Sequence, residues 1–164
     1  MLPKQFQNLI KYFSQFPGIG SRQATRFVFH LLRQPDTQFN GFIKDLQNLK
    51  SEVKVCPNCF FIFDKNGGES TTCHICSDPK RSRTVICVVE KETDILAIEK
   101  TGHYNGVYHI LGGNIYTTQD SQEEGFLLKN LKDRIVKLID SGTQKSDIEL
   151  IFAINPTPYG DSTV

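Results

Sequence analysis

The chain has 164 residues, of which 38% are hydrophobic and 23% charged, and its formal net charge is +1. This length suits one ordinary domain or two to three small ones. No apolar run reaches the roughly 18 residues of a membrane span, and the N-terminus lacks the apolar core and cleavage site of a secretory leader. We therefore expect a cytoplasmic protein, in whose reducing surroundings paired cysteines bind metal more often than they form disulfides.

The small net charge conceals an asymmetry between the two halves. Residues 1–90 hold 12 Lys/Arg against 7 Asp/Glu, whereas residues 91–164 hold 7 against 11. The first half is thus at +5 and the second at −4. A modestly basic half is compatible with nucleic-acid binding but does not require it.

The first 54 residues have three apolar stripes at helical spacing, which predict a small all-helical unit. Pro35 interrupts the pattern before the third stripe, and Asp36 is predicted as the N-cap of the helix that follows. The stripes are formed by Phe6, Leu9, Ile10 and Phe13, then Ala24, Phe27, Val28, Leu31 and Leu32, then Phe39, Phe42, Ile43, Leu46 and Leu49.

The sequence FPGIGSRQATR, residues 16–26, joins the first two predicted helices and is typical of a helix-hairpin-helix. Gly18 and Gly20 permit a tight turn and the close approach of another backbone. Their amides, with the start of the second helix, are suited to holding a phosphate. Arg22 and Arg26 lie four residues apart, so both side chains lie on one face of the helix. From that face they could contact the phosphate backbone of DNA, and such contacts do not read the base sequence. The alternative is an ordinary helical turn with a solvated basic face.

Four of the five cysteines form the pattern C-x2-C-x13-C-x2-C, with Cys56, Cys59, Cys73 and Cys76 as its members. Two such pairs supply four thiolates for tetrahedral zinc and leave no open coordination position, which predicts a structural site rather than a catalytic one. Redox-active pairs are the alternative, although two pairs in a loop-rich segment fit that chemistry poorly. His74 is expected at the surface, because four cysteines suffice.

From residue 84 the pattern becomes alternating strand and helix, which predicts a parallel sheet covered by helices. Strands are predicted in TVICVVE, GVYHILGG and DIELIFAIN, with a helix from about Asp94 to Gly102 between the first two. A second helix is predicted from a capping box of Ser121 and Glu124 to a C-cap at Gly142. Cys87, inside the first strand, is expected to be a small core residue.

Glu90 ends the first strand of this sheet, where open α/β folds place their sites. A carboxylate there is suited to holding Mg²⁺ or to acid–base chemistry, and Asp161, after the third strand, is a candidate to converge with it. A solvated Glu at a strand end is the equally weighted alternative. Asp94 is expected to cap the helix that follows.

The order of these motifs resembles the RecR family of bacterial recombination mediators. A helix-hairpin-helix, a four-cysteine zinc motif, and a sheet opening with ICVVEKETDILAIEKTGHYNGVYHIL are similar to that family along essentially the whole chain. The resemblance implies a helix-hairpin-helix domain at 1–54, a four-cysteine zinc finger at 55–79 and a C-terminally incomplete Toprim domain at 80–164. The fold class is thus α/β with a small all-α N-terminal part.

The resemblance also implies a function. RecR-like proteins are not enzymes; they bind single- or double-stranded and gapped DNA and act with RecO and RecF to load RecA onto gapped single strands coated with SSB. They form ring-like homo-oligomers around DNA. Arg22 and Arg26 fall on the family's DNA-contacting positions, the four cysteines on its zinc ligands, and Glu90 on its first Toprim acid.

Four departures from the family pattern bear on these expectations. The loop between the cysteine pairs is long, GGNIYTTQDSQEEG lacks the usual Pro and Gly-Ile-Gly, and Tyr159 replaces the first acid of a pair whose second is Asp161. We expect a site with so few carboxylates to hold Mg²⁺ poorly. The last few dozen residues of the family, which support oligomerisation, are also lacking. The rival hypothesis is a Mg²⁺-dependent Toprim enzyme such as a nuclease, primase or topoisomerase fragment.

Overall fold

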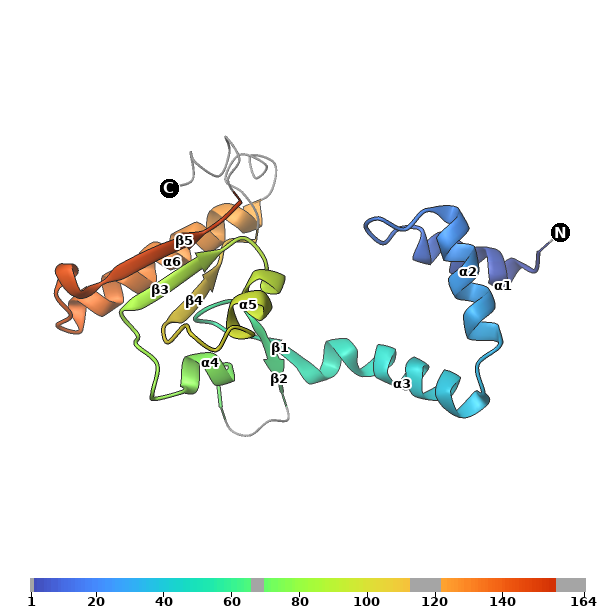
Figure 1. Ribbon diagram of the computed structural model, residues 1–164, viewed down its shortest axis with the longest axis horizontal. Helices are drawn as coiled ribbons and strands as arrows, with labels where there is room; N and C mark the ends of the chain where they lie inside the picture. Colours follow the sequence, from blue (N-terminus) through green and yellow to red (C-terminus); the bar gives the residue numbers. More distant parts are fainter. Residues whose placement is uncertain (1, 66–69, 113–121, 156–164) are drawn as a thin grey trace. The chain divides into compact units, whose positions relative to one another are not determined.

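A computed structural model describes residues 2–65, 70–112 and 122–155, with the side chains of 122–126 excepted (Figure 1). Contacts cluster into two compact units, residues 1–51 and residues 52–164, which are described separately below. The second unit contains both the cysteine segment and the sheet. The three-part division at residues 54 and 79 stays a prediction. No helix within the described residues is long and apolar enough to cross a membrane.

The first unit consists of the three predicted helices: α1 (Lys4–Phe13), α2 (Ser21–Leu32) and α3 (Asp36–Glu52). Aromatic side chains join α1 to α2, with Phe6 edge-on to Phe29 at a centroid distance of 4.7 Å. The prediction of Asp36 as an N-cap is wrong by one position. The Pro35 carbonyl already accepts the backbone N–H groups of residues 38 and 39, so Asp36 lies in the first turn, where its charge favours the helix dipole.

The cysteine segment, residues 53–77, opens the second unit with a short antiparallel hairpin of β1 (Val53–Val55) and β2 (Ile62–Asp64). The first cysteine pair lies in the loop of this hairpin. The second pair lies at α4 (His74–Ser77), a single turn that begins directly after Cys73. His74 is exposed, as expected. The loop signal at Gly67-Gly68 lies outside the described residues.

The sheet has three parallel strands in the order β4-β3-β5, which confirms the predicted parallel arrangement. The strands are β3 (Val85–Val89), β4 (Val107–Ile110) and β5 (Glu149–Ala153), joined by α5 (Glu92–Glu99), α6 (Gln122–Asp140) and a 3₁₀ turn, η1 (Lys145–Asp147) (Figure 1). Its central strand β3 is fully buried beyond its first residue, because both faces are covered.

The alternation of side chains along β3 and β4 divides the core into two clusters. One face packs against α6 through Leu131, with Ile135 and Leu138 beside it. The opposite face packs against α5 and the cysteine segment, and Cys87 is one of its buried members. Cys87 is thus a core residue, as predicted, and burial raises the pKa of its thiol to about 11.

Two of the predicted helix boundaries depend on local hydrogen bonds. Helix α5 starts at Glu92, earlier than expected, and the carboxylate of Asp94 accepts the backbone N–H of Lys91 at 2.9 Å, which confirms its capping role. Gly142 ends α6 with φ +98°, and its N–H donates to the Ile139 carbonyl, so the C-cap prediction is confirmed. Ser121 lies outside the described residues, and its capping box stays a prediction.

Candidate nucleic-acid interface and metal centre

The turn between α1 and α2 presents backbone rather than side chains. Gly18 has φ +76°, a left-handed conformation that favours glycine, whereas Gly20 is extended and has no such requirement. A Cβ added at either position would meet no atom within 4 Å, so both glycines face open space. The backbone amides of this turn are therefore accessible to a ligand.

The start of α2 has no counter-charge of its own. Its N-cap is Gly20, which offers no side-chain acceptor, and its first turn has no acidic residue. The unpaired N–H groups and the positive end of the helix dipole therefore face solvent, which is an arrangement suited to a phosphate. The hydroxyl of Ser21 does not cap the helix either, because it accepts no backbone N–H of α2 among the described hydrogen bonds.

Arg22 and Arg26 extend the same cationic surface along α2. Both are exposed, and neither forms an ion pair with the residues that the structure describes. The structure thus brings together all four residues that the sequence singled out: two glycines in the turn and two arginines on the adjoining helix face. The arrangement can hold backbone phosphates by amide and guanidinium donors without reading bases.

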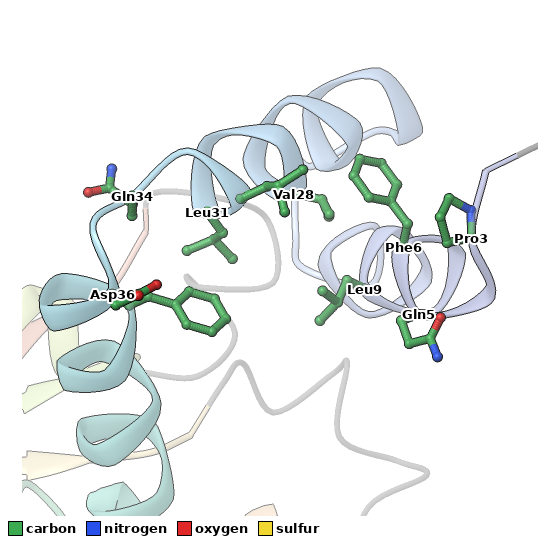
Figure 2. A pocket seen from close by; sticks show the side chains of 10 residues that line it. Pro3, Gln5, Phe6, Leu9, Val28, Leu31, Gln34 and Asp36 are labelled. Atoms are coloured by element: carbon green, nitrogen blue, oxygen red, sulfur yellow. The ribbon is translucent and has the colours of Figure 1, made fainter.

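The opposite face of α2 has a different chemistry. A hollow of ≈ 390 Å³ lies there, with side chains of α1, α2 and the start of α3 around it (Figure 2). Phe6, Leu9, Val28 and Leu31 make it largely apolar, and its lining includes Asp36 but no lysine or arginine. Phosphate is therefore not its ligand, and the cationic face of α2 is the candidate nucleic-acid interface.

The four cysteines of the second unit form one buried cluster. All four Sγ atoms lie within 4.8 Å of one another, and each residue is 0–2% exposed. Sγ of Cys59 and Sγ of Cys73 are 3.5 Å apart, too far for a disulfide. Tetrahedral zinc with Zn–S bonds of about 2.3 Å places its sulfurs about 3.8 Å apart, so the separations of 3.5 Å to 4.8 Å in this cluster suit that ion with small shifts of the side chains.

Backbone groups already support the thiolate form of this cluster. The N–H of Cys73 donates to Sγ of Cys56, and the N–H of Cys76 donates to Sγ of Cys73, both at 3.4 Å. Hydrogen bonds with the other thiols lower the pKa of Cys56, and the hydrogen bond with Cys56 raises the pKa of Cys59. Four sulfurs this close cannot ionise together unless a cation compensates them, which is what a structural metal supplies.

The cluster is closed on the inside by the sheet. The Cys59 carbonyl accepts the N–H of Ile110 at 3.0 Å, so the cysteine segment pairs with the free edge of β4. Arg134 on α6 donates to the carbonyls of Asn58 and Tyr108, at 3.0 and 2.7 Å, and ties the same loop to the same edge. No sequence pattern pointed to Arg134, because a basic residue on a helix surface is usually solvated.

Phe60 is held in an unusual backbone conformation in this loop. It has φ +66°, uncommon for a bulky residue, and its ring lies edge-on to His109 at 5.3 Å. Phe61 is buried in the core beside the cysteines, and Phe63 packs against the same cluster. These three aromatic side chains therefore pack within the second unit.

Glu90 lies at the end of β3, as expected, but its carboxylate is already engaged. It is 6% exposed, and its two oxygens accept the backbone N–H and the side-chain amide of Asn155, at 3.0 and 2.6 Å. Asn155 follows β5, so this clasp ties the ends of two neighbouring strands. Sequence reasoning missed Asn155, for which only its place at a strand end was a signal. Asp161 and Tyr159 lie outside the described residues.

Comparison with known proteins agrees with this geometry. The family model described as the RecR helix-hairpin-helix matches residues 6–50, and that of the Toprim domain matches residues 84–164. A protein of Flavobacterium johnsoniae named recombination protein RecR is 39% identical over 160 residues, which cover 98% of this chain and 72% of that protein. Proteins of the same name from Desulforapulum autotrophicum and Roseiflexus castenholzii are 38% and 36% identical, with 76% and 74% of their lengths covered.

The chain belongs to the RecR family. Within that family, the helix-hairpin-helix match covers the turn with Gly18 and Gly20 and the arginines of α2. The Toprim match begins one residue before β3 and therefore includes Glu90. The predicted resemblance and the predicted fold class are both confirmed: a helical N-terminal part, a four-cysteine cluster, and a parallel sheet with helices.

Proposed function

We propose that this chain is a non-enzymatic mediator of DNA repair and recombination that binds DNA through the turn and the cationic face of α2. It acts in the cytoplasm with RecO and RecF to load RecA onto gapped single-stranded DNA. The observation that carries the proposal is the exposed pair Arg22 and Arg26 beside an uncapped helix start, in a member of the RecR family. Donors of this kind bind the phosphate backbone and are indifferent to sequence.

The double substitution Arg22→Ala with Arg26→Ala tests the DNA interface. Each phosphate contact to a single strand contributes a salt slope of about −0.7, which corresponds to a roughly fivefold gain in affinity at about 0.1 M salt. Losing two contacts should therefore weaken binding about 25-fold and flatten the slope by about 1.4. Fluorescence anisotropy of a labelled oligothymidylate across a salt series measures both quantities.

Lys44→Ala is the matched control, since Lys44 is an exposed cation on α3 of the same unit. It should change affinity and slope far less than the arginine pair does. Equal binding by the wild type and the double variant would overturn the assignment of the interface.

The four-cysteine cluster supports zinc as the resident metal of this function. Zinc bound there would have Cys56, Cys59, Cys73 and Cys76 as its complete ligand set, and the metal would supply folding free energy and no reaction chemistry. The chain's own contribution is the burial of the four thiols and the backbone N–H bonds that hold them. Metal content by elemental analysis, with one equivalent per chain expected, tests the identity of the ion.

The state of Glu90 supports a protein without catalysis at the sheet edge. A carboxylate with both oxygens hydrogen-bonded to Asn155 gives up those bonds if it turns toward Mg²⁺. We therefore expect no Mg²⁺-dependent nicking of supercoiled circular DNA. Nicking by the wild type that disappears in Glu90→Gln would establish the rival, a Toprim enzyme.

The partner role needs an assay of its own. RecA loading onto SSB-coated gapped DNA should accelerate when the chain is added together with RecO and RecF, and the arginine double variant should lose that acceleration. The proposal includes assembly into a homo-oligomer that encloses DNA. Light scattering with and without DNA measures the molecular mass and would show a monomer if that part is wrong.

A further inference from the structure

The positive charge of the first half is concentrated in its first 35 residues. They contain five Lys/Arg and no Asp or Glu, whereas residues 36–90 contain seven of each. The whole surplus of +5 therefore lies on α1, α2 and the turn between them. Arg22 and Arg26 account for only two of these charges. The other three are Lys4, Lys11 and Arg33.

Arg33 lies on the same face of α2 as the two arginines already described. It follows Arg26 by seven residues, a spacing that returns to the same side of a helix. Arg26, Phe29, His30 and Arg33 together line a hollow of ≈ 350 Å³, so the helix pattern and the surface agree. All four of these residues are exposed.

The two arginines of this hollow are free of ion pairs with the described residues and can bind an anion. Within the described residues, Arg26 and Arg33 form no ion pair, while His30 is held by Gln34 through a 2.7 Å hydrogen bond between Nε2 atoms. Phe29 is 39% exposed, and its ring packs edge-on against Phe6. Its exposed part is the apolar side chain of the hollow and lies among the basic residues. A sugar–phosphate backbone has this alternation of apolar and anionic parts.

We propose that this hollow is a second phosphate subsite, in which Arg33 and Arg26 hold a backbone phosphate of the DNA strand that the turn engages. The inference rests on the proposed function and extends it to residues beyond the hairpin motif. Arg22 and Arg33 are eleven residues apart, about 16 Å along the helix. One strand of a duplex advances about 3.4 Å per phosphate, so the two arginines reach phosphates several nucleotides apart.

Arg33→Gln tests the subsite in the salt series used for the hairpin. Loss of one phosphate contact should weaken oligothymidylate binding about fivefold at about 0.1 M salt and flatten the slope by about 0.7. Lys44→Gln removes the same charge from α3 of the same unit and controls for general electrostatics. An unchanged slope and affinity, or a change no larger than in Lys44→Gln, overturns the subsite.

A structural explanation of Arg33 is distinguishable by the same data. Arg33 is the C-cap residue of α2, where a cation also favours the helix dipole. If that is its only role, Arg33→Gln lowers the melting temperature and leaves the salt slope unchanged, and the subsite is refuted.

The failure of the subsite and that of the proposed function give different results. A loss in the Arg22/Arg26 variant with none in Arg33→Gln refutes the subsite and leaves the hairpin interface standing. A loss in Arg33→Gln and in the single variant Arg26→Ala, with none in the single variant Arg22→Ala, supports the hollow as a DNA site and refutes the hairpin assignment. A wild-type protein that fails to bind the oligonucleotide at low salt overturns both.

Discussion

Acidification should destabilise the second unit through one buried histidine. His109 on β4 is 0% exposed, and its Nε2 donates to the Leu127 carbonyl at 2.9 Å. Its Nδ1 has no hydrogen-bond partner within the described residues, so a proton added there would be buried, and the backbone groups of Leu127 and Asn58 favour the charged ring only in part. Burial lowers the pKa of His109 to about 4, and the nearby guanidinium of Arg134 acts in the same direction.

The sign and size of the effect follow from linkage. The unfolded chain binds the proton at the ordinary histidine pKa of 6.5, whereas the folded chain resists it down to about 4. The free energy of unfolding is therefore unaffected by His109 above pH 6.5, where the histidine is neutral in both states, and it decreases as the pH falls toward 4. The loss is about 2 kcal/mol at about pH 5 and about 3 kcal/mol once the folded state is also protonated.

Urea unfolding at several pH values between about 7.5 and 5, in wild type and His109→Gln, measures this loss. Glutamine keeps a donor for the Leu127 carbonyl but binds no proton, so its free energy of unfolding should fall about 2 kcal/mol less over this interval. Protonation of the cysteines is common to both proteins and cancels in the difference. Identical pH dependence in the two proteins would refute the buried-histidine argument.

Three further predictions test the metal, a buried network and the turn. Chelation should lower the melting temperature and speed hydrogen exchange at the Ile110 amide, since that N–H donates to the cysteine segment; unaltered melting and exchange would contradict a structural metal. Tyr108→Phe should cost about 2 kcal/mol in urea unfolding, because the buried hydroxyl donates to the Glu99 carboxylate at 2.6 Å; a neutral result would show that water replaces it. Gly18→Ala should cost about 1 kcal/mol because φ is +76°. Gly20→Ala, with an extended backbone and equally open space, should cost only the roughly 0.5 kcal/mol by which alanine is the poorer N-cap. Equal losses of melting temperature in the two variants would contradict this difference.

The sequence predicted the elements that carry a long, regular pattern. The three N-terminal helices and the parallel strands appear where their apolar patterns place them, because each helical stripe contains several turns and β3 and β4 are continuous buried runs. Strand β5, at the edge of the sheet, has no fully buried residue. Strands β1 and β2 have three residues each and α4 has four, too few for any period to be visible. These short elements owe their conformation to the cysteines they position.

The candidate sites divide in the same way. The cysteine cluster and the arginines of α2 were predictable because their members repeat at short, fixed spacing. The partners of Glu90 and of the Asn58 carbonyl were not, since Asn155 lies 65 residues and Arg134 lies 76 residues away in the chain. Such contacts form only once the sheet and α6 have assembled, so no local sequence pattern predicts them.

The four-cysteine cluster and the excess of basic residues lie in different compact units of this chain. The cysteines share one buried cluster with Cys87, Val89, Tyr108 and Ile110, so loss of a metal bound there would remove packing from a face of the sheet as well as from the loop. The surplus charge, by contrast, lies entirely on residues 1–35, in the other unit. Substitutions in separate compact units are additive when they share no partner. The arginine variants should therefore leave any effect of metal removal on melting unchanged, which thermal melts with and without a chelator measure.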